Sequence, residues 1–176
     1  MTATVPRLQN LKPADLSPAQ RTAYDAITAE LGNAFEGGPY PILLHFPGVA
    51  EGALRILKAF RNERKIDRKL YELCVLIVAK EWASDFEWRT HEPRAIAAGL
   101  NPDICAALRA GALPAFSGDD ERLVYAVTKE MMTTRALSQA THDESVRVLG
   151  TEQTVELVTA IGFYTMLAIV LAGFEP

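Results

Sequence analysis

The sequence has few of the residues and motifs that indicate a bound cofactor. Only two of its 176 residues are cysteines, Cys74 and Cys105, and they do not form a CxxC pair. Neither a GxGxxG nor a Walker glycine loop occurs, so no motif predicts dinucleotide or nucleoside triphosphate binding. An HExxH motif is missing too, and the carboxylate and imidazole of EWRTH, which have metal-ligand spacing, lack an evident third ligand. We therefore predict no metal and no cofactor.

Other absences limit the partners and the compartment. The net charge is −4 and the basic residues are dispersed, so no nucleic-acid partner is expected. The segment 1–16 has no apolar core of signal-peptide type. The apolar stretch 161–174 has about 14 residues, fewer than the roughly 20 that span a bilayer. We expect a cytoplasmic protein with no membrane segment and with reduced cysteines.

Strand-like alternation between hairpin turns is also missing, and helix signals follow one another along the chain. Pro6 and Pro13 predict an irregular arm over 1–16, and the glycines and prolines of GGPYPILLHFPGVA predict an irregular apolar connection. Helices are expected over 17–32, 47–61, 67–82, 84–98, 102–111 and 119–134, and two more are expected after N-caps at Ser138 and Thr151. A chain of this length fits one compact domain. We predict an all-α, single-domain helical bundle over 17–176.

The stretch 70–99 combines an apolar run with reactive polar side chains. Residues 73–79 have no polar face, so a helix there must be covered on all sides, with Glu72 at its start. Ser84, Glu87 and His91 follow at i, i+3 and i+7, which places them on one face of the next helix. If the two helices pack together, Glu72 approaches Glu87 and His91. Two carboxyls and an imidazole in a partly dry pocket can divide into an acid and a base, because like charges and burial move their pKa values apart.

Each of these residues also has a plainer interpretation. Glu87 and His91 are spaced for an exposed i,i+4 pair, which stabilises a helix by about 0.2–0.5 kcal/mol. Ser84 is equally suited to cap the start of its helix. Trp88 is suited to packing, in the core or in the wall of a pocket.

Three further candidates lie in apolar surroundings. Tyr40 and His45 belong to the apolar connection, where they either line the mouth of a pocket or serve packing and a backbone hydrogen bond. Cys74 lies in the apolar run, where a free cysteine usually behaves as a small hydrophobic residue. The alternative is that the Cys74 thiol reaches the pocket near Glu72.

The run from Glu72 through EWASDFEWRTHEPRAIAAGL resembles the carboxymuconolactone decarboxylase superfamily, an all-helical group that also contains the alkyl hydroperoxidase D proteins. GPYPILLHFPGVA and TVELVTAIGFYTMLAIVLAGFE are similar to the family's upstream segment and terminal helix. In the hydroperoxidase branch, a glutamate, a CxxC pair and a histidine form a proton relay that feeds a redox-active disulfide. The resemblance puts the glutamate at Glu72 and the histidine at His91, but Ser84 and Glu87 take the cysteine positions. Because a disulfide peroxidase needs two thiols, the decarboxylase branch, which also carries EW..H without CxxC, is favoured.

The resemblance implies a cofactor-free lyase for a small carboxylated lactone. Such a substrate loses carbon dioxide and receives a proton on carbon, which requires a positioned acid in a dry pocket. We expect His91 to donate or shuttle the proton, Glu72 to orient His91, and Glu87 to act as a second acid or base. The expected substrate-binding residues are Ser84, His45, Trp88 and Tyr40.

Two other functions remain as alternatives to the lyase, and the resemblance also implies an oligomeric state. A thiol peroxidase would depend on Cys74, and a non-catalytic assembly or binding protein would keep the scaffold alone. Members of the family generally form trimers or hexamers, so the resemblance implies a homo-oligomer with the apolar last helix as a plausible interface.

Overall fold

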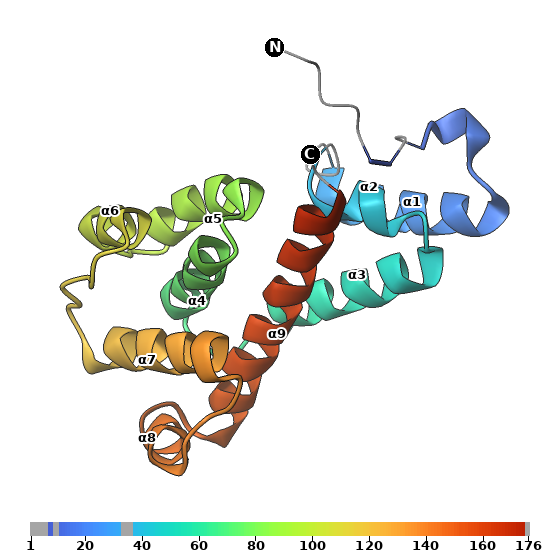
Figure 1. Ribbon diagram of the computed structural model, residues 1–176. Helices are drawn as coiled ribbons and strands as arrows, with labels where there is room; N and C mark the ends of the chain where they lie inside the picture. The colour runs from blue at the N-terminus through green and yellow to red at the C-terminus, as the bar shows by residue number, and fades with distance from the viewer. Residues whose placement is uncertain (1–6, 9–10, 33–36, 175–176) are drawn as a thin grey trace. The chain divides into compact units, whose positions relative to one another are not determined.

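The protein is built from α-helices (Figure 1). The computed structural model describes residues 7–8, 11–32 and 37–174, and over these ranges it contains no strand. The helices are α1 (Pro18–Leu31), α2 (Pro39–Leu43), α3 (Pro47–Asn62), α4 (Arg68–Glu81), α5 (Asp85–Ala97), α6 (Pro102–Ala110), α7 (Asp119–Thr134), α8 (Gln139–Leu149) and α9 (Thr151–Phe174), and a 3-10 helix, η1 (Pro13–Asp15), precedes them. The predicted all-α class is confirmed.

Most helix boundaries follow the capping residues. Ser17 Oγ accepts a hydrogen bond from the Gln20 amide at 3.3 Å, and Gln20 Oε1 accepts one from the Ser17 amide at 3.0 Å, which is a complete capping box for α1. Asp67 and Asn101 cap α4 and α6 through their side chains. Gly111 ends α6 in the left-handed conformation, with φ of 74°. The predicted ends of these helices are confirmed.

Three local predictions are wrong. The connection that was expected to be irregular contains α2, because Pro39 occupies a first-turn position, where a proline favours a helix instead of breaking it. Pro13 starts η1 in the same way, within the arm expected to be irregular. Thr151 is the first residue of α9 and not its N-cap, since Gly150 already accepts a hydrogen bond from the Thr154 amide. Residues 1–6 and 9–10 of the arm lie outside the described residues.

The chain divides into two compact units. The first comprises the residues up to Glu63 and those from Met166 onward, and the second runs from Arg64 to Thr165. In the first unit α3 contacts α1 and α2. An ion pair of 2.9 Å joins Arg61 Nη1 and Glu30 Oε1 there. The single domain expected over 17–176 stays a prediction.

Helix α4 is the centre of the second unit. It packs against α5, α6 and α7, and α7 packs against α8 (Figure 1). Every residue from Leu70 to Ala79 is buried, as expected for a helix without a polar face. This cover includes Glu72, whose carboxyl therefore needs polar partners inside the unit.

Helix α9 is 24 residues long, and its length and composition would allow it to cross a membrane. Core helices of soluble proteins pass the same test, and 44% of the most apolar window of α9 is buried within the protein. The helix thus extends the apolar segment to spanning length, which the count of about 14 apolar residues did not predict.

Candidate active site

Three buried titratable side chains meet between α4 and α5. Glu72 lies in α4, and Glu87 and His91 lie in α5; each is only 4% exposed. His91 Nδ1 is 2.7 Å from Glu72 Oε2, and His91 Nε2 is 3.4 Å from Glu87 Oε2. The predicted approach of Glu72 to the other two residues is confirmed, and the alternative of an exposed Glu87–His91 pair is wrong. We call these three side chains the Glu72–His91–Glu87 array.

The three side chains of the array lie in a row and do not surround a common point. The two carboxylates face opposite nitrogens of the same imidazole, so the three groups do not converge on one point as the ligands of a metal must. Among the described residues, no three or more His, Cys, Asp or Glu side chains are grouped so that they could hold a metal ion. An imidazole between two carboxylates is instead suited to hold and move a proton.

The surroundings of His91 favour its protonated form. Burial alone would lower the pKa of the imidazole, but the hydrogen bonds and the charges of Glu72 and Glu87 outweigh burial and raise the pKa above the ordinary value of 6.5. Because a carboxylate only accepts hydrogen bonds, the Nδ1 of His91 carries a proton toward Glu72. The other oxygen of that carboxyl, Oε1, lies 3.7 Å from Arg68 Nε.

Two tyrosines that the sequence analysis did not single out adjoin the array. The ring of Tyr164 lies edge-on to His91, with ring centroids 5.1 Å apart and an angle of 84° between the planes. Tyr71 donates a hydrogen bond of 3.0 Å from its hydroxyl to that of Tyr164. Burial raises the pKa of both phenols, so both stay protonated at neutral pH. The sequence feature that could have identified Tyr164 is its position as a phenol inside the apolar run AIGFYTMLAIV.

Ser84 and Trp88 place two further donors on the same face of α5. Ser84 occupies the N-cap position of α5, as the plainer interpretation expects, but its side chain makes no capping hydrogen bond. Ser84 Oγ and Trp88 Nε1 are buried and have no hydrogen-bond partner within the described part of the chain. The guanidinium of Arg109 lies over the Trp88 ring, 4.8 Å from its centroid, and so orients the indole. Unpaired buried donors are rare in proteins, which makes both residues candidates for substrate contact.

Tyr40 and His45 belong to the first unit. Tyr40 lies in α2 and is 5% exposed, and His45 follows α2 and is exposed. The His45 amide donates to the carbonyl of Ile42 at 3.1 Å. Because the Glu72–His91–Glu87 array lies in the second unit, a substrate contact of Tyr40 or His45 stays a prediction.

Both cysteines are buried free thiols. Burial raises the pKa of Cys74 to about 12 and the pKa of Cys105 to about 11. Thiols with such pKa values are almost entirely protonated at neutral pH, and the thiol is a far weaker nucleophile than the thiolate. Neither cysteine therefore has the surroundings of a reactive thiolate.

Comparison with known proteins adds no family to this picture. No protein-family model matches the chain, and no curated protein or solved structure matches it. A function must therefore be argued from the Glu72–His91–Glu87 array, its neighbours and the resemblance in the sequence.

Proposed function

We propose that the protein is a cofactor-free acid–base enzyme, a carbon–carbon lyase of the carboxymuconolactone decarboxylase type, with the Glu72–His91–Glu87 array as its active site. The observation that carries this proposal is the buried imidazole of His91 with a carboxylate at each ring nitrogen. The raised pKa of His91 supports its role as the proton donor.

The three residues have different roles in the proposed reaction. Glu72 holds Nδ1–H, which orients the ring and favours the imidazolium, much as the aspartate of a catalytic triad fixes its histidine. Nε2–H is the donating side of His91, and Glu87 beside it is the second acid or base. The raised pKa of His91 supports a role as an acid, because its protonated form is favoured over that of an ordinary imidazole.

The proposed substrate is a small carboxylated unsaturated lactone. Its carbon–carboxylate bond breaks, carbon dioxide leaves, and the electron pair of that bond enters the conjugated lactone. A proton from His91 is then delivered to carbon, and the imidazole takes up a proton from solvent to restore the acid. Each cycle therefore consumes one proton and needs no oxidant or reductant.

Ser84 and Trp88 are the proposed donors for substrate oxygens. Negative charge builds up on the lactone carbonyl as carbon dioxide leaves, and preorganised donors in a dry site stabilise such charge. The unpaired Ser84 Oγ and Trp88 Nε1 lie on the helix face that also carries Glu87 and His91. The same proposal includes the alkyl hydroperoxidase D-like arrangement of the helices. It also includes a trimeric or hexameric assembly, whose mass light scattering would measure.

The test is ultraviolet-monitored turnover of 4-carboxymuconolactone by metal-stripped protein. We expect turnover by the wild type and a loss of roughly 100- to 10,000-fold in His91→Gln, the usual contribution of a general acid. His142→Gln is the matched control, because His142 is an exposed histidine of α8, and it should keep full activity. Absence of wild-type turnover would remove this substrate, and equal turnover by folded His91→Gln would remove the array as the active site.

A further inference from the structure

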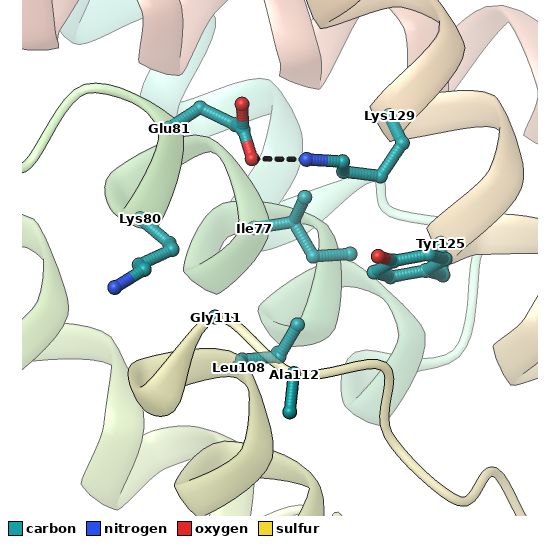
Figure 2. A pocket seen from close by; sticks show the side chains of 8 residues that line it. All are labelled: Ile77, Lys80, Glu81, Leu108, Gly111, Ala112, Tyr125 and Lys129. Carbon is teal, nitrogen blue, oxygen red and sulfur yellow. Dashed lines mark hydrogen bonds and ion pairs between the residues drawn. The ribbon is translucent and has the colours of Figure 1, made fainter.

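The second unit also contains a pocket near the C-terminal end of α4 (Figure 2). Its volume is about 160 Å³, and it is lined by Ile77, Lys80, Glu81, Leu108, Gly111, Ala112, Tyr125 and Lys129. These residues come from α4, α6, the segment after α6, and α7, so we call it the α4–α6–α7 pocket. Lys80 follows Glu72 by roughly two helical turns, about 12 Å along α4. The pocket is therefore separate from the Glu72–His91–Glu87 array.

Two small residues that follow α6 line this pocket. Gly111 adopts φ of 74° to end the helix, and a Cβ built there would meet no atom within 4 Å. Ala112 adds only a methyl group. Ile77 and Leu108 are 1% and 4% exposed, and their side chains give the pocket an apolar inner surface (Figure 2).

Polar groups lie around this apolar surface. Lys129 Nζ forms an ion pair with Glu81 Oε1, and the hydroxyl of Tyr125 points toward Ile77 in the middle of the group (Figure 2). Lys80 Nζ donates a hydrogen bond of 2.7 Å to the carbonyl of Arg109, near the end of α6, where the helix carbonyls carry partial negative charge. Two lysines and one glutamate leave the pocket with one net positive charge.

We propose that the α4–α6–α7 pocket binds a small ring-shaped monocarboxylate. The carboxylate lies between Lys129 Nζ and the Tyr125 hydroxyl, and the ring packs against Ile77, Leu108 and Ala112. The pocket is smaller than the roughly 300–1,000 Å³ of drug-sized sites, which selects a ligand with a single ring. The single excess positive charge selects a monoanion. This inference does not depend on the proposed lyase activity.

Benzoate is the probe, titrated into the whole protein while backbone amide resonances are recorded by NMR. We expect saturable shifts at residues 111–112 and 125–129, with a Kd on the order of 1 mM. Benzamide, which has the same shape without the charge, should bind at least tenfold more weakly.

Two substitutions at the ion pair should act in opposite directions. Lys129→Met removes the cation and should weaken benzoate binding about tenfold, whereas Glu81→Gln removes the competing carboxylate and should tighten binding several-fold. Lys58→Met is the matched control, because Lys58 pairs with Glu30 in the first unit at 3.5 Å, and it should leave binding unchanged. Ala112→Leu keeps every charge but fills the space, and should abolish binding.

The amide spectrum of each variant shows whether it is folded. Equal affinity for benzoate and benzamide would overturn the proposal, as would weakening by both ion-pair substitutions. Binding that survives Ala112→Leu would also overturn it, because the site would then be surface charge and not the pocket.

Discussion

Buried glutamates occur at two places in the second unit, and their partners differ. Glu72 and Glu87 face the imidazole of His91. Glu121, which is 2% exposed, faces the ammonium of Lys69 at 2.9 Å and accepts a hydrogen bond of 2.9 Å from the Ser117 amide. All three carboxyl groups are nearly inaccessible to solvent, but their partners differ in how readily they release a proton.

The partner of Glu121 keeps its proton under all ordinary conditions. Burial by itself would raise the pKa of Glu121, but the hydrogen bonds from Lys69 and from the backbone outweigh it and lower the pKa below the ordinary 4.5. The hydrogen bond to Glu121 in turn raises the pKa of Lys69. Both groups stay charged at neutral pH, so this pair holds α4 and α7 together and moves no proton. The imidazole of His91, unlike the ammonium of Lys69, can lose and regain a proton near neutral pH.

The largest expected difference between the two kinds of buried glutamate is in the turnover of their glutamine variants. Glu87→Gln should lower 4-carboxymuconolactone turnover by roughly 100-fold or more, because the amide cannot exchange a proton with His91. Glu121→Gln removes an equally buried carboxylate and should leave the turnover per folded molecule at the wild-type level. A similar loss of turnover in both variants, measured on folded protein, would contradict the assignment of a proton-transfer role to Glu87 alone of these two glutamates.

The effect of Glu121→Gln should appear in the free energy of unfolding and not in turnover. Glu121→Gln should lower the free energy of unfolding by about 1.5–3 kcal/mol at pH 7, the range for hydrogen bonds that involve a charged group. Because the pKa of Glu121 is lowered in the folded state, this contribution is present above pH 4.5 and is lost as the pH falls through the folded-state pKa.

Urea unfolding at pH 7 and at pH 3 measures this difference. Glu144→Gln is the control, because Glu144 is an exposed glutamate that pairs with Arg147 in α8, and it should unfold like the wild type at both pH values. A stability deficit of Glu121→Gln that persists unchanged at pH 3 would contradict the assigned role of the charge.

The smallest expected effect is a shift in the pH at which His91 titrates. His91 should titrate above pH 6.5 in an NMR experiment, and Glu72→Gln should lower that midpoint, because it removes a charge that favours the imidazolium. A pKa that is raised on folding contributes stability below pH 6.5, and this contribution is lost as the pH rises through the folded-state pKa. Tyr71→Phe keeps both carboxylates and should shift the midpoint less. A midpoint that Glu72→Gln leaves unchanged would mean that the 2.7 Å contact does not tune His91.

The sequence predicted what depends on neighbours along the chain. Ser17, Asn101 and Gly111 mark helix ends by their own backbone preferences, and the spacing of Glu87 and His91 places them on one helix face. The apolar run after Glu72 needs cover on all sides, and if the next helix supplies part of that cover, Glu72 approaches His91.

What the sequence did not predict depends on contacts distant along the chain. Tyr71 and Tyr164 are 93 residues apart, and no local pattern pairs their hydroxyls. The α4–α6–α7 pocket is lined by residues of three helices together with Gly111 and Ala112, and such a meeting of helices depends on their packing. Helix α2 was missed because a proline favours either a turn or a first helical residue, and only its surroundings decide which.

His91 is held at both ring nitrogens and covered by the edge of Tyr164, so the imidazole does not have to rotate to exchange a proton. After Nε2 gives up its hydrogen, the ring is left as the single neutral tautomer that Glu72 selects, with its lone pair toward Glu87. Protons therefore enter and leave on one side of the ring only. Which carboxylate faces which nitrogen thus fixes the nitrogen at which the ring can lose and regain its proton.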